Sequence, residues 1–105
     1  MDLLEIRGRL DEIDARMERL FEERMRLCGE VAEYKIATGK AVYDAGREKE
    51  KIETLTAMAE GEFNRQAVAE LFLQMMTLSR RYQYQTIAGR TPDLDLGFQR
   101  IRELK

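Results

Sequence analysis

Apolar residues in the first third of the chain are spaced alternately three and four residues apart. They are Leu3, Ile6, Leu10, Ile13, Met17, Leu20, Leu27, Val31 and Tyr34, with one place skipped at position 24. This heptad spacing places the apolar side chains in a seam along one face of a helix. Because no proline interrupts the repeat and Gly39 can end a helix, the pattern predicts one helix from about Leu3 to about Thr38.

The predicted first helix is too long for a chain of this size to cover. About 36 residues, each rising about 1.5 Å, make a rod of about 54 Å. A compact chain of about 100 residues has a radius of gyration of only about 13 Å. The seam therefore needs a partner, and we expect an intertwined or antiparallel homodimer.

Two shorter helices are expected after a connector. Asp44 is a suitable N-cap for a helix that continues to about Glu60, where Gly61 closes it. Asn64 can cap a third helix that continues to about Ala88. The apolar face of this third helix comprises Val68, Leu71, Phe72, Met75, Met76, Leu78 and Tyr82.

These elements predict an all-α fold with three helices, of which the first is very long. We expect one helical domain in residues 1–88 and a C-terminal tail in residues 89–105. Leu94, Phe98 and Ile101 are spaced to form one face of a short helix in this tail.

Composition narrows the classes of function. With 105 residues and a net charge of −2, the chain is a single small domain, and its charge argues against a nucleic-acid partner. It contains no histidine, the commonest metal ligand and general base. Its single cysteine, Cys28, suits a reducing compartment, and no apolar run resembles a membrane span or a signal peptide. We therefore expect a cytoplasmic protein with no membrane or nucleic-acid partner.

Arg24 occupies the skipped place in the seam, where a charge is costly unless it is paired. One explanation is an ion pair with Glu23, Glu30 or an acid on another helix. The other is a ligand carboxylate or phosphate bound by the planar guanidinium. Lys35 lies eleven residues later, which returns it to within about 20° of Arg24, about 16 Å along the helix. The two long side chains can thus converge on a small anion.

Two polar clusters accompany these cations. Ser79 and Gln83, four residues apart, continue the apolar stripe of the third helix and must find partners. Such pairs serve either as bonds between helices or as neutral donors to a ligand. Asp44, Arg47 and Glu48 open the second helix, as a cap with a surface ion pair or as part of a site.

Together these groups supply cations, neutral donors and an acid, but no nucleophile, histidine base or metal ligand. Such a set suits a reaction that needs orientation and electrostatic stabilisation without covalent chemistry. It points to a pericyclic rearrangement of a small dianion, with no cofactor and no metal.

From Leu3 to Gln85 the sequence resembles the all-helical class of chorismate mutases. The segments that carry the resemblance are LLEIRGRLDEIDARM, EERMRLCGEVAEYK, VYDAGREKE and LFLQMMTLSRRYQ. Their joint pattern is specific, although each part alone is not. The resemblance implies an intertwined homodimer that converts chorismate to prephenate, a Claisen rearrangement in phenylalanine and tyrosine biosynthesis.

The resemblance also implies roles for single residues. Arg24 matches the arginine that holds a substrate carboxylate, and Ser79 matches another carboxylate contact. Lys35 and Gln83 match the two donors to the ether oxygen, where negative charge builds as the C–O bond breaks.

The remaining matches lie at the second helix and near the N-terminus. Arg47 matches a cation near the pocket, while Glu48 and the backbone near Asp44 match contacts to the ring hydroxyl. Arg7 matches an arginine that reaches into the site of the other subunit. Geometry favours this last role, because Arg7 lies 17 residues before Arg24, or about 25 Å along a rigid rod.

Two other functions remain open from the sequence. One is an isochorismate pyruvate lyase of the same fold, although Glu48 favours the mutase because it can accept from the ring hydroxyl of chorismate. The other is a non-catalytic helical dimer, a scaffold or regulatory module in which polar seam residues only set the register.

Overall fold

The computed structural model describes residues 1–90, which form three helices and no strand. The helices are α1 (Leu3–Thr38), α2 (Ala45–Met58) and α3 (Glu62–Arg90). The predicted all-α fold with a very long first helix is therefore confirmed. The predicted helical face in the tail, at Leu94, Phe98 and Ile101, lies outside the described residues.

α1 has the bounds that the sequence predicts. Asp2 is its N-cap, and the Asp2 carboxylate accepts a hydrogen bond from the backbone N–H of Glu5 at 2.8 Å. The helix ends at Gly39, whose φ of 72° is left-handed. Glycine adopts this conformation without the clash that a Cβ atom would cause.

α2 begins as predicted and ends slightly early. The side chain of Asp44 accepts a hydrogen bond from the backbone N–H of Arg47 at 3.0 Å, which confirms Asp44 as the N-cap. The helix ends at Met58, two residues before the predicted end, because Ala59 has an extended backbone with φ −78° and ψ 144°.

The predicted cap of α3 is wrong. α3 begins at Glu62, directly after Gly61, whose φ is 85°. Asn64 therefore lies inside the first turn, and its side-chain Nδ2 donates to the backbone carbonyl of Glu60 at 2.9 Å. The preference of asparagine for N-caps placed the helix start three residues too late.

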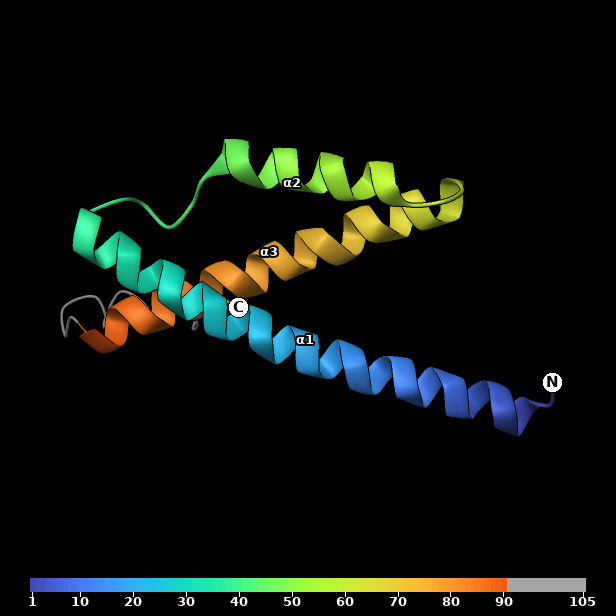
Figure 1. Cartoon of the computed structure of the whole chain (residues 1–105). Helices are drawn as coiled ribbons and strands as arrows, with labels where there is room; N and C mark the ends of the chain where they lie inside the picture. Colours follow the sequence, from blue (N-terminus) through green and yellow to red (C-terminus); the bar gives the residue numbers. More distant parts are fainter. Residues whose placement is uncertain (91–105) are drawn as a thin grey trace, which may run out of the picture.

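The helices pack around α3, which contacts both α1 and α2. In Figure 1, α3 crosses α1 and α2 lies along the first half of α3. Gly29 allows a close approach at the crossing, because a Cβ atom there would lie 3.3 Å from the ring of Tyr82. The buried apolar residues in this part of the chain are Cys28, Ala32, Val42, Met76 and Ala88.

The first half of α1 extends beyond the other helices (Figure 1). Its seam residues are between 41% and 63% exposed, and they are Leu3, Ile6, Leu10, Ile13, Met17 and Leu20. The described residues span 56 Å and have a radius of gyration of 17.2 Å, against about 13 Å for a compact chain of this length. Most of the seam is thus left exposed by the rest of residues 1–90. Among residues 1–90, no helix is long and apolar enough to cross a membrane.

Candidate functional site

Arg24 reaches from α1 to α3, and the groups that its guanidinium contacts there are neutral. Its Nη1 donates to the hydroxyl of Ser79 and lies 3.8 Å from the Sγ of Cys28, while Nη2 lies 3.9 Å from the Sδ of Met76. The side chain is half-buried. Within residues 1–90, no carboxylate lies within 4.0 Å of this guanidinium.

The ion pair considered for Arg24 is therefore not found in the part of the chain that the structure describes. Glu30, one of its candidate partners, pairs instead with Arg26 at 3.0 Å. Both members of that pair are exposed, at 64% and 65%. Arg24 thus has no ion-pair partner among the described residues.

Ser79 and Gln83 are both buried in α3, at 5% and 7% exposure. The Ser79 hydroxyl accepts from Arg24 and donates to the backbone carbonyl of Met75 at 2.8 Å, so both of its roles are used. The Oε1 of Gln83, in contrast, is buried without a hydrogen-bond partner in residues 1–90. Such an atom costs about 1–3 kcal/mol unless a partner is supplied from elsewhere.

Lys35 is held by the connector between α1 and α2. Its Nζ donates to the backbone carbonyl of Val42 at 2.6 Å, and Val42 is itself buried. An ammonium group has three N–H donors, so two remain for other partners. Lys35 and Arg24 stand on one continuous helix, which preserves their predicted separation of about 16 Å along the axis.

A small cavity joins the three helices beside Arg24. It has a volume of about 110 Å³ and is lined by Arg24, Arg47, Glu48, Lys51 and Met76. The structure thus brings together three of the predicted site residues, one from α1 and two from α2. Asp44 is occupied by its capping bond at the start of the same helix.

Glu48 has a partner that the sequence did not suggest. Its Oε1 accepts from the Nη1 of Arg80, and the two side chains are 20% and 27% exposed. The guanidinium of Arg80 also lies over the ring of Tyr43, 5.0 Å from its centroid. This pair ties the first turn of α2 to α3 and leaves the second carboxylate oxygen of Glu48 free of any hydrogen bond to residues 1–90.

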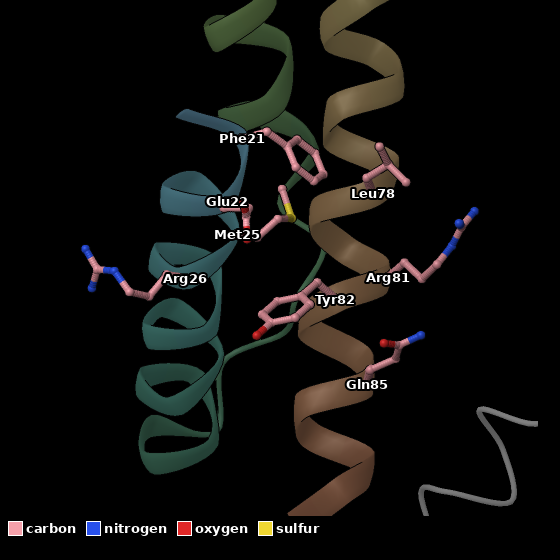
Figure 2. Close-up of a pocket in the computed structure, with 8 residues that line it drawn as sticks. All are labelled: Phe21, Glu22, Met25, Arg26, Leu78, Arg81, Tyr82 and Gln85. Atoms are coloured by element: carbon pink, nitrogen blue, oxygen red, sulfur yellow. The ribbon is translucent and has the colours of Figure 1, made fainter. Parts of the chain in front are cut away.

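A larger cavity, of about 530 Å³, lies between α1 and α3 and contains none of the predicted site residues. It is lined by Phe21, Glu22, Met25, Arg26, Leu78, Arg81, Tyr82 and Gln85. Figure 2 shows the rings of Phe21 and Tyr82 directed into the gap, whereas Arg26 and Arg81 point away from it. The interior of this cavity is therefore apolar, and it is a poor site for an anion.

The family model for chorismate mutase type II matches residues 6–84. The match covers more than half of the chain and includes all eight predicted site residues. The chain belongs to the chorismate mutase type II family. It is therefore a chorismate mutase, an isomerase, and its substrate is chorismate. Comparison with individually curated proteins gives no match.

Arg7 is the one predicted site residue that a single mutase chain keeps far from the others. It is exposed on the projecting half of α1. Because α1 is continuous, Arg7 lies about 25 Å along the axis from Arg24. Only a second chain can bring an arginine from this position to the cavity.

Two charged residues at the candidate site were not among those predicted from the sequence. Lys51 follows Arg47 by four residues, a spacing that places both on one face of α2 and that gave a usable signal. Arg80 gave no such signal, because its pairing with Glu48 depends on how α2 docks against α3.

Proposed function

We propose that the chain converts chorismate to prephenate by a Claisen rearrangement, in the biosynthesis of phenylalanine and tyrosine. Catalysis would come from substrate preorganisation and electrostatic stabilisation, with no cofactor. The observation that carries this proposal is the half-buried Arg24, held in place by neutral groups and without a carboxylate partner in residues 1–90.

Arg24 holds one substrate carboxylate, and Ser79 contacts it once its hydroxyl proton turns from the Met75 carbonyl toward the ligand. A guanidinium binds a carboxylate through two parallel N–H bonds and presents five donors, of which Ser79 takes one. The substrate carboxylate supplies the negative charge that the neutral sulfurs and hydroxyl around the guanidinium lack. Fixing this carboxylate and the second one in the compact conformer of the substrate supplies proximity between the bonding carbons.

Lys35 and Gln83 act on the ether oxygen. In the rearrangement the C–O bond breaks while a C–C bond forms, and negative charge builds on this oxygen. The Val42 carbonyl orients the ammonium of Lys35. The donor from Gln83 is its Nε2–H group, because the unpartnered Oε1 can only accept. Because both contacts strengthen as charge develops, they stabilise the transition state more than the bound substrate.

Glu48, Arg47 and Asp44 complete the site from the first turn of α2. Arg80 holds one oxygen of Glu48, so the other can accept a hydrogen bond from the ring hydroxyl of chorismate. Asp44 fixes the start of the helix and the backbone that also contacts this hydroxyl. Arg47 adds positive potential to the cavity.

The enzyme works as an intertwined homodimer in which Arg7 completes the site of the partner chain. The exposed seam of α1 and the extended shape of the described residues support this assembly. Each Å² of apolar surface that a partner chain buries stabilises the dimer by about 25 cal/mol. We place the enzyme in the cytoplasm, where its one cysteine, the buried Cys28, stays reduced.

The test is to give purified protein chorismate and isochorismate separately and to identify the products. Prephenate from chorismate, with isochorismate unchanged, supports the mutase. Release of pyruvate from isochorismate would identify a lyase of the same fold. If neither reaction occurs, the protein is a helical dimer without catalytic function.

A further inference from the structure

Lys51 lines the cavity of Arg24 but is not among the residues to which the family resemblance gives a role. It lies on α2, four residues after Arg47, and is half-buried. It makes no hydrogen bond or ion pair within residues 1–90. A lysine on a solvated surface needs no partner, but this one faces a cavity shared with two arginines.

The charges that line this cavity do not balance. Three cations, Arg24, Arg47 and Lys51, face a single acid, Glu48. That acid is already paired with Arg80. Like charges four residues apart on a helix, such as Arg47 and Lys51, repel each other. An anionic group in the cavity relieves this repulsion.

The size of the cavity indicates how much of the substrate enters it. Its volume of about 110 Å³ is well below the roughly 300–1,000 Å³ of pockets that enclose a whole small ligand. It therefore accepts one charged group of a larger molecule. Arg24 approaches this volume from α1 and Lys51 approaches it from α2.

We infer that Lys51 is a substrate-binding residue that contacts, from α2, the same chorismate carboxylate that Arg24 holds from α1. The inference rests on the proposed function and adds a residue to its site. A carboxylate keeps its charge throughout the rearrangement, so this contact is equally strong in the bound substrate and the transition state. Lys51 therefore lowers KM and leaves kcat unchanged, in contrast to Lys35.

The test compares Lys51→Met with Lys49→Met. Lys49 is exposed on the same helix and lies outside this cavity, so its replacement removes the same charge without the contact. We expect Lys51→Met to raise KM for chorismate about tenfold or more, with kcat within about twofold. Lys49→Met should change neither constant. Lys51→Arg, which retains the charge, should recover most of the loss in KM.

A second readout does not depend on turnover. Calorimetric titration with prephenate, which retains both carboxylates, should give a Kd about tenfold weaker in Lys51→Met than in Lys49→Met. Thermal unfolding of each variant checks that the fold is retained. Equal KM and Kd values in the two variants, or a loss confined to kcat, would overturn the role of Lys51.

The mutase reaction and the role of Lys51 can be refuted independently of each other. Wild-type protein that binds prephenate but forms none from chorismate would refute the mutase reaction, while the titration would still report on Lys51. Wild-type protein that neither binds nor reacts would refute both.

Discussion

Arg24 on α1 donates to the hydroxyl of Ser79 on α3, and that hydroxyl donates to the backbone carbonyl of Met75 at 2.8 Å. Arg24, which interrupts the apolar seam of α1, thus makes a polar contact between the two longest helices, α1 and α3. The contact fixes the guanidinium without neutralising it. A site built in this way is preorganised for an anion, because the protein orients the charge before the ligand arrives.

Replacing Lys35 tests the stabilisation of the ether oxygen. Lys35→Ala should raise the barrier by about 3 kcal/mol or more, roughly a hundredfold or greater loss of kcat. Lys40→Ala is a matched control, because Lys40 is exposed beyond the end of α1 and its Nζ lies over the ring of Tyr34. Steady-state kinetics with chorismate measures both. Full activity in Lys35→Ala would remove this residue from the mechanism.

The role of the Gln83 amide as a donor to the ether oxygen determines how the rate of the rearrangement depends on pH. A glutamine donates without gaining a proton, so the wild-type rate should be flat from mildly acid to mildly basic pH. In Gln83→Glu the carboxyl can donate only when protonated, and burial at this position raises the pKa of a carboxyl group. The activity of that variant should therefore rise as the pH falls. A steep rise at low pH in the wild-type enzyme would contradict the role of Gln83.

Mixing two inactive variants tests the composite site. Arg7→Ala and Arg24→Met should each lose most activity, because each removes a carboxylate contact. If Arg7 serves the partner's site, each mixed dimer contains one intact site and one doubly altered site. Random reassembly at equal concentrations should then restore about a quarter of wild-type activity. No recovery, in a mixture shown by native mass spectrometry to contain mixed dimers, would mean that Arg7 does not act across the interface.

Local signals in the sequence predicted the helices well. α1 was predicted to within a residue because its seam is periodic and a glycine follows it. The start of α3 was wrong, because Asn64 suits both a cap and a first-turn position, and the left-handed Gly61 decided between them. The N-cap preference of Asn64 alone does not reveal the left-handed conformation of Gly61.

The arrangement of the candidate site could be predicted only where its residues share one helix. The spacing of Arg24 and Lys35, and of Ser79 and Gln83, follows from helical geometry. The contact of Arg24 with Ser79 and the pairing of Glu48 with Arg80 join helices that are distant in sequence. These contacts depend on how α3 docks against its neighbours, which no local pattern encodes.

The role proposed for Arg24 is to bind a carboxylate of chorismate in a mutase site. The most direct measurement is the rate of prephenate formation from chorismate by the wild-type protein and by Arg24→Met, alongside the free energy of unfolding of each. The variant should lose about a hundredfold or more in kcat/KM. Its stability should be equal or higher, because methionine removes a half-buried charge that has no anionic partner in the described residues. Undiminished prephenate formation by Arg24→Met, or a loss of activity that only follows unfolding, would contradict the claim.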